Sequence, residues 1–338
     1  MDEEKGPVNA PEFGAGEWIN SIPYSIRDLR GRVVLVDFWD YTCVNCLHTL
    51  PYVAAWHRRY EPLGLTVVGV HTPEFGFAGQ ASLIEDAVRR FDLPYPVLVD
   101  REYETWQAYA NRYWPAKYLI DVTGKIRGAH FGEGAYAEVE KAIQGLLKER
   151  EGNAEAEFPP PMEPVRAEDA SGAVCYRATP EVYLGFRRGM PGNPDPQPGQ
   201  AVLYKDHGQH AEGYPYLDGP WQIADEYSAR PFGFSSSQVS RLHLKYMSKE
   251  VNLVIHPGTS GRAELTLLQD GAPLAAEALG EDAKEAGGRA LVVIDTPRMY
   301  RLVNNPEIAG HELTIETTSD GVALYAFTFV SCLVPDQQ

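Results

Sequence analysis

The stretch Val33-Val34-Leu35-Val36-Asp37-Phe38-Trp39-Asp40-Tyr41-Thr42-Cys43-Val44-Asn45-Cys46 decides the fold of the first half of this chain. Its first six residues are β-branched and apolar almost without a break, which is typical of a short strand buried on both faces. After a turn at 40–42, apolar side chains recur at helical spacing from 44 to 60. The two cysteines therefore stand where a buried strand ends and a helix begins.

The residues that follow alternate between strand and helix patterns. A capping-box pattern starts one of the helices, with Ser82 as its N-cap and Glu85 three residues on. Thr123-Gly124 predicts the turn of a β-hairpin. The predicted strands are 65–70, 96–99, 117–121 and 126–131, and the predicted helices are 82–91, 102–110 and 135–148. This order predicts an α/β fold for residues 1–152.

The pattern changes after the last helix. Residues 153–165 include Phe158-Pro159-Pro160-Pro161 and read as a stiff linker. From 166 to 338 the apolar period is two, and turns such as Asp270-Gly271 separate the segments. We therefore expect a second domain over 166–338, an all-β sandwich of the jelly-roll kind.

Length and charge narrow the function classes. A chain of 338 residues fits two domains. Thirty basic against 47 acidic residues give a net charge of −17, which disfavours nucleic acid and anionic membrane surfaces as partners. The apolar runs are too short for membrane insertion. The start, residues 1–5, has no export signal pattern, so we expect a cytoplasmic protein as the chain stands, or an extracytoplasmic one if a leader or membrane region has been removed.

The Cys43-Val44-Asn45-Cys46 motif carries the chemistry. Free N–H groups at a helix N-terminus stabilise a thiolate, so Cys43 is expected to be the exposed, attacking sulfur and Cys46 the shielded, resolving one. Such a pair exchanges disulfides through a mixed disulfide and needs no cofactor. The competing interpretation is half of a zinc site. Zinc needs two more ligands, there is no second C-x-x-C, and His48 is too close in sequence, so we expect no metal.

Asp37 is the candidate acid–base residue. Within an apolar strand its carboxyl group should be buried, and burial raises the pKa of a carboxyl group. It could then take the proton from Cys46, through water, as that thiol becomes the resolving nucleophile. The alternative is a surface or capping acid without a catalytic role.

These residues, together with two prolines, resemble the active-site segment of thioredoxins. Pro51 matches the proline that kinks the family's active-site helix, and the segment 114–121 resembles the one that holds its cis-proline loop. The resemblance implies that Pro115 faces the cysteines and that Trp39, Trp114 and Ala116 help to bind the substrate. Seventy-two positions separate Pro115 from Cys43, which leaves room for an extra strand and helix and resembles the TlpA and peroxiredoxin-like branch.

Longer runs resemble the soluble C-terminal region of DipZ-type redox proteins, from about residue 7 to 332. The runs are Pro11-Glu12-Phe13, Gly69-Val70-His71-Thr72-Pro73-Glu74-Phe75, Asn111-Arg112-Tyr113-Trp114-Pro115-Ala116, His130-Phe131-Gly132-Glu133-Gly134, Thr179-Pro180-Glu181-Val182-Tyr183-Leu184-Gly185 and Ala323-Leu324-Tyr325-Ala326-Phe327-Thr328-Phe329. The resemblance implies a thioredoxin-like domain followed by a β-sandwich similar to carbohydrate-binding modules. It implies a protein or small disulfide as substrate, a thiol protein as electron donor, and a glycan as a candidate ligand of the β domain.

Two other functions compete with disulfide exchange. A thiol peroxidase would need Pro-x-x-x-Thr-x-x-Cys, but Asp40 and Val36 occupy the Thr and Pro positions before Cys43. A glycan- or protein-binding module with a passenger redox domain would use surface aromatic residues of the β domain. The candidates are Tyr214, Tyr216, Trp221 and Tyr300, for each of which core or loop packing is the simpler interpretation.

The remaining cysteines and histidines have weaker patterns. Cys175 and Cys332 lie near the two ends of the β domain, and a bridge requires their Cα atoms to come within about 7 Å. In a reducing cytosol we expect free, buried thiols instead. The Asp206, His207 and His210 group suggests a metal, although a structural loop explains it as well. His71 follows a strand and is a candidate for the rim of the active site.

Overall fold

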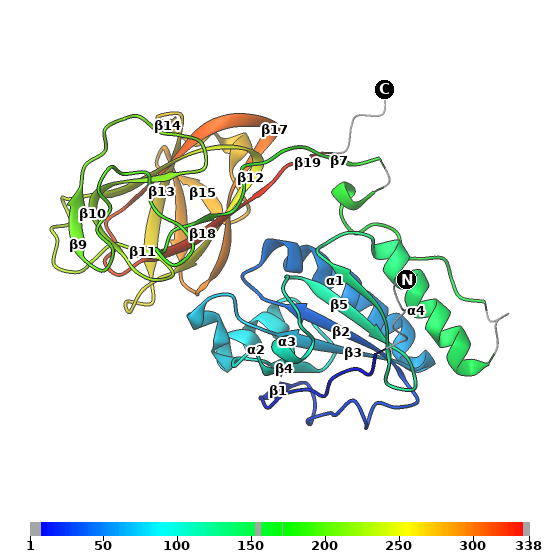
Figure 1. The fold of residues 1–338 in the computed structure, drawn as a ribbon. Coiled ribbons are helices and arrows are strands. Elements are labelled where there is room, and N and C mark those ends of the chain that lie inside the picture. The colour runs from blue at the N-terminus through cyan, green and yellow to red at the C-terminus, as the bar shows by residue number, and fades with distance from the viewer. Residues whose placement is uncertain (1–7, 153–156, 171, 334–338) are drawn as a thin grey trace, which may run out of the picture. The chain divides into compact units, whose positions relative to one another are not determined.

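The computed structural model describes residues 8–152, 157–170 and 172–333. Contacts within the chain divide it into two compact units, Met1–Ala170 and Ser171–Gln338. Figure 1 shows helices and strands together in the first unit and strands in the second. Each unit is described by itself below.

The first unit is built on a six-stranded sheet in the order β1-β4-β3-β2-β5-β6. The strands are β1 (Trp18–Ile19), β2 (Val33–Trp39), β3 (Leu65–His71), β4 (Val97–Val99), β5 (Ala116–Ile120) and β6 (Ile126–Phe131). The helices are α1 (Val44–Tyr60), α2 (Ala81–Arg90), α3 (Glu104–Ala108) and α4 (Tyr136–Glu151). β2 lies between parallel β3 and antiparallel β5, which explains why all seven of its residues are buried. The predicted strand before the cysteines is therefore confirmed.

Most predicted elements of this unit are present, but the start of one helix is wrong and one strand and two 3-10 helices, Glu61–Leu63 and Gly76–Gly79, were not predicted. The hairpin forms between β5 and β6, and Gly124 adopts the positive φ of +82° that its turn requires. The capping box at Ser82 is wrong, because the N-cap of α2 is Gln80 and makes no side-chain hydrogen bond. Strand β1 was not predicted. It is only two residues long and pairs with β4 at the edge of the sheet.

Residues 157–170 pack along the first unit after α4 ends. The Met162 N–H donates to a carboxylate oxygen of Glu140 at 2.8 Å, and the Val165 N–H donates to the Tyr52 hydroxyl at 2.7 Å. The Tyr52 hydroxyl in turn donates to Asp169 at 2.9 Å. Much of the segment predicted as a linker therefore lies against α1 and α4, and the compact unit ends at Ala170.

The regular elements described in the second unit are strands, apart from a 3-10 helix at Ala276–Ala278. The strands are β7 (Val174–Cys175), β8 (Val182–Tyr183), β9 (Ala201–Tyr204), β10 (Pro215–Ile223), β11 (Ser228–Ala229), β12 (Ser240–His256), β13 (Ala263–Gln269), β14 (Ala272–Pro273), β15 (Ala283–Ala286), β16 (Arg289–Ile294), β17 (Arg298–Thr317), β18 (Ala323–Val330) and β19 (Cys332–Leu333). The predicted all-β class is confirmed. Eleven strands form one hydrogen-bonded set, because long β12 pairs with β10 along its first half and with β18 along its second.

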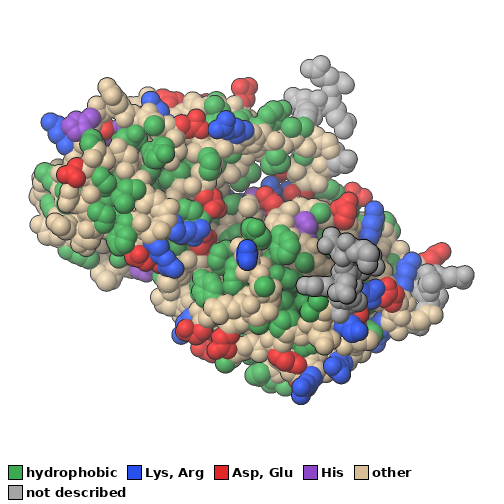
Figure 2. All heavy atoms as spheres, viewed as in Figure 1, with side chains coloured by type: hydrophobic (Ala, Val, Ile, Leu, Met, Phe, Trp, Pro, Cys, Tyr) green, Lys and Arg blue, Asp and Glu red, His purple; other side chains and the backbone are tan. Residues whose placement is uncertain are grey.

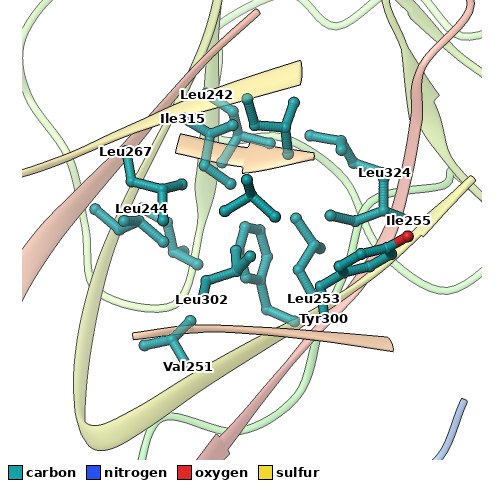
Figure 3. Close-up of a cluster of buried hydrophobic side chains, with 14 of the residues drawn as sticks. Leu242, Leu244, Val251, Leu253, Ile255, Leu267, Tyr300, Leu302, Ile315 and Leu324 are labelled. Carbon is teal, nitrogen blue, oxygen red and sulfur yellow. The ribbon is translucent and has the colours of Figure 1, made fainter. Parts of the chain in front are cut away.

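One apolar core fills this second unit. Alternating side chains of the long strands point into it, and Figure 3 shows Leu244, Leu253 and Tyr300 meeting there. Trp221 is fully buried in the same core, and its indole N–H donates to backbone carbonyls of Asp218 and Arg241. Trp221 and Tyr300 are therefore core residues, as the simpler interpretation held, and cannot offer a glycan an exposed ring.

A disulfide joins Cys175 to Cys332, with the Cα atoms 4.0 Å apart. The two residues lie directly opposite each other in the small β7–β19 sheet. The expectation of free thiols is therefore wrong. The first and last strands of this unit are neighbours, a topology that the distance of 157 residues along the chain conceals.

The surface charges and the lengths of the described helices concern two kinds of partner, nucleic acid and membrane. On the face shown in Figure 2, acidic and basic side chains are interspersed and do not gather into one basic patch. None of the helices in the described ranges is long and apolar enough to cross a membrane.

Candidate active site

The dithiol lies at the start of α1, directly after β2. Cys43 is the N-cap residue, and its sulfur accepts the Cys46 N–H at 3.2 Å. Cys43 is half-buried, whereas Cys46 is completely buried. The geometry therefore provides one sulfur that a substrate can reach and one behind it, in the order that the sequence predicts.

The surroundings of both thiols disfavour the thiolate form. Burial raises the pKa of Cys43, and the carboxylates of Glu74 and Asp40 raise it further, against the lowering effect of the Cys46 N–H. Burial raises the pKa of Cys46 well above its ordinary value. Burial and the neighbouring carboxylates thus act against the stabilising effect expected of the helix N-terminus on the Cys43 thiolate.

Asp37 lies on β2 directly opposite Lys117 on β5. Both side chains are buried, and 4.0 Å separates the Lys117 Nζ from the Asp37 Oδ1. Among the described residues, neither group has a hydrogen-bond partner. Burial raises the pKa of Asp37 to about 6, although the Lys117 charge opposes the rise. At neutral pH Asp37 is thus mostly ionised, but it binds a proton more readily than an ordinary aspartate does.

Sequence reasoning missed Lys117. Burial lowers the pKa of its ammonium group, while the Asp37 carboxylate, Cys46 and Cys43 raise it. The Lys117 charge therefore interacts with both sulfurs. The signal was present, since Lys117 stands two residues after Pro115 in an otherwise apolar strand. Only the β2–β5 register shows that it faces Asp37.

The predicted substrate-binding loop has the expected backbone. The Trp114–Pro115 peptide bond is cis. Trp114 is partly exposed, and its indole N–H donates to the Thr72 carbonyl at 3.0 Å. The side chains of Trp39 and Ala116 are completely buried. Of the three predicted substrate-binding side chains, Trp114 alone is open to a substrate in this structure.

A second buried acid holds the loop before Cys43. Asp40 accepts hydrogen bonds from Thr42 and from the Glu74 N–H, and its Oδ1 lies 3.6 Å from the His71 Nε2. Burial acts to raise the pKa of Asp40, but the His71 contact and these hydrogen bonds hold it below its usual value. His71 is completely buried and stacks on Tyr41, so it lies beneath the rim predicted for it.

The other candidate ligands have ordinary partners. His48 pairs with Glu133 at 2.8 Å. His210 bridges Asp206 and Glu312, at 2.8 and 3.0 Å, which fits a structural loop. Within the described parts of the chain, no group of three or more His, Cys, Asp or Glu residues is arranged to hold a metal ion.

The first unit combines a mixed sheet, a cis-proline and a pair of thiols at the start of a helix, as the resemblance to thioredoxin-like, redoxin-type proteins implies. Residues 8–129 match the AhpC/TSA family, and residues 179–329 match the family described as thioredoxin like C-terminal domain. Protein DipZ of Mycobacterium bovis is 30% identical over 332 residues, which is 95% of this chain and 42% of that protein. The expected resemblance to TlpA, redoxin and DipZ proteins is therefore confirmed.

Smaller relatives match less than half of this chain. Thiol-disulfide oxidoreductase YkuV of Bacillus subtilis is 28% identical over 142 residues, which cover 42% of this chain and 95% of that protein. The solved structure of a thiol-disulfide isomerase from Corynebacterium glutamicum is 27% identical, covers 41% of this chain and 97% of that one, and has a TM-score of 0.37. This chain spans less than half the length of the DipZ proteins it matches.

Proposed function

We propose that this chain reduces disulfide bonds in proteins through its Cys43–Cys46 dithiol. The observation that carries the proposal is one accessible and one buried thiol at the start of α1, together with a buried carboxylate–ammonium pair on β2 and β5 of the same unit. The relatives named for thiol–disulfide exchange support it. A thiol peroxidase is not favoured, because Asp40 stands where a peroxidase requires Thr.

Each residue then has one task. The Cys43 thiolate attacks a substrate disulfide and forms a mixed disulfide. Asp37 accepts the Cys46 proton through water, and the Cys46 thiolate attacks the Cys43 sulfur and releases the reduced substrate. The protein is left with a Cys43–Cys46 disulfide, which a thiol electron donor must reduce. Lys117 acts as a positioning residue that keeps the Asp37 carboxylate ionised at neutral pH.

The high pKa of Cys43 supports the reducing direction. Strong disulfide oxidants stabilise their reduced form through a low-pKa thiolate. Here burial and neighbouring carboxylates act against the thiolate, so the dithiol gives up electrons more readily. The Cys175–Cys332 bridge supports an oxidising compartment outside the cytosol, since disulfides persist there. It favours the extracytoplasmic alternative over a cytoplasmic location.

Trapping with Cys46→Ser tests the roles of the two thiols. With insulin as substrate, this variant should accumulate a mixed disulfide through Cys43, which peptide mapping would locate. The matched Cys43→Ser variant should accumulate none. Trapping through Cys46 in that matched variant, and none through Cys43, would overturn the assignment. The redox potential of the pair gives the direction, and a value near −270 mV is expected of a reductase, against about −120 mV for an oxidant.

A further inference from the structure

The second unit carries a redox-capable group that the proposed function does not use. Cys175 is exposed, and Cys332 is partly exposed. Their neighbours Val174 and Tyr176 are 42% and 53% exposed. A thiolate can therefore approach the bridge from solvent, and an apolar side chain on each side of Cys175 is available for contact with the attacking protein.

The bridge also stands apart from what holds the unit together. β7 and β19 are two residues long and form a separate sheet, and the side chains of β7 are exposed and lie outside the apolar core. A two-residue ribbon is not stable by itself. Once the bridge is cut, the two strands can separate, which lowers the effective concentration of one thiol near the other and disfavours re-closure. Exposed disulfides of this kind are the labile ones.

We propose that Cys175–Cys332 is a second thiol–disulfide exchange site, whose reductant is a reduced C-x-x-C dithiol of the Cys43–Cys46 type. This inference rests on the proposed function of that dithiol. The Cys43 thiolate attacks the exposed Cys175 sulfur, the Cys175–Cys332 bond breaks, and Cys332 leaves as a thiolate that takes a proton from solvent. Cys46 then loses its proton to Asp37 and attacks the Cys43 sulfur, which releases Cys175 as a second thiolate. Two electrons pass, so that the 43–46 pair ends oxidised and the 175–332 pair reduced.

Two full-length variants separate donor from acceptor. The acceptor is Cys43→Ser/Cys46→Ser, which keeps only the bridge. The donor is Cys175→Ser/Cys332→Ser, reduced with dithiothreitol and desalted. After mixing, iodoacetamide alkylation and peptide mass mapping count the thiols at 175 and 332. We expect one bridge lost per donor dithiol oxidised, at a rate within about tenfold of that for insulin under the same conditions.

The control arms make a failure informative. If the same donor reduces insulin but the bridge stays oxidised, this inference is overturned and the reductase function still holds. Neither disulfide reduced would overturn both, whereas reduction of the bridge alone would support the inference and remove insulin-type proteins as substrates.

A second donor guards against misfolding of the first. Cys46→Ser keeps the native bridge and should form a dimer with the acceptor through a Cys43–Cys175 mixed disulfide. Prior alkylation of Cys43 should abolish this dimer. If the dimer instead forms through Cys332, or does not form while insulin is trapped, the proposed attack on Cys175 is wrong.

Discussion

Replacing Asp37 by Asn tests the buried carboxylate through stability as well as activity. Its pKa is raised from 3.8 to about 6, because burial disfavours the charged form. The folded chain therefore binds this proton more tightly than the unfolded chain does. The wild type must lose stability as the pH rises through this window, and the Asn variant has no such loss.

The size of the effect follows from the shift. One pKa unit corresponds to 1.36 kcal/mol, so a shift of this size costs the wild type about 3 kcal/mol once the carboxyl group is fully ionised. About 2 kcal/mol of that cost develops between pH 4 and pH 7. The free energy of unfolding of Asp37→Asn, minus that of the wild type, should therefore grow by about 2 kcal/mol over this range.

Urea unfolding followed by tryptophan fluorescence measures this difference. Every tryptophan except Trp221 lies within residues 1–170, so the signal reports mainly on the first unit. Asp121→Asn is a matched control with the opposite sign. Burial acts to raise the pKa of Asp121, but hydrogen bonds from Thr123 and Lys125 lower it overall, so its variant should lose stability against the wild type as the pH rises. A pH-independent difference for Asp37→Asn would refute the assigned titration.

Three further predictions concern the same unit. Lys117→Met removes the charge that lowers the pKa of Asp37, so that pKa should rise further. The pH midpoint of mixed-disulfide resolution, measured by quenched flow, should then move upward. An unchanged midpoint would contradict the pairing. Asp40→Asn removes a carboxylate that raises the pKa of Cys43, so the pH midpoint of Cys43 alkylation by iodoacetamide should fall, and a rise would contradict the electrostatics. A fragment of residues 1–152 lacks the hydrogen bonds that 157–170 make to Glu140 and Tyr52. Its free energy of unfolding in urea should therefore be lower than that of a 1–170 fragment, by on the order of 2 kcal/mol. Both fragments should reduce a small disulfide. Equal stability of the two fragments would show that the packed segment contributes nothing.

The parts of this fold that local patterns determine were predictable. The apolar run of β2 and the helical spacing after Cys46 place the dithiol, because both patterns arise from neighbours in the chain. The pairing of Lys117 with Asp37 and the Cys175–Cys332 bridge could not be predicted from such patterns. Each depends on strand register between segments far apart in sequence, which no local pattern encodes.

The packed segment after α4 was missed for a different reason. Residues 157–170 contain several prolines and few periodic apolar positions, so they resemble a linker. What holds them is a set of single hydrogen bonds to side chains such as Tyr52 and Glu140. Aromatic hydroxyls and a buried carboxylate leave no periodic signal, so a sequence pattern cannot distinguish a docked segment from a free one.

The Cys175–Cys332 bond makes the second unit a covalent ring. A pull on the chain from both sides would pass from one sulfur to the other, and the strands between them would carry no load while the bond is oxidised. A protease cut in a loop inside the ring would release no fragment. Reduction would open this ring, and the strand pairing and the apolar core alone would then resist a pull or hold a nicked chain together. Two electrons thus decide whether the unit is covalently closed.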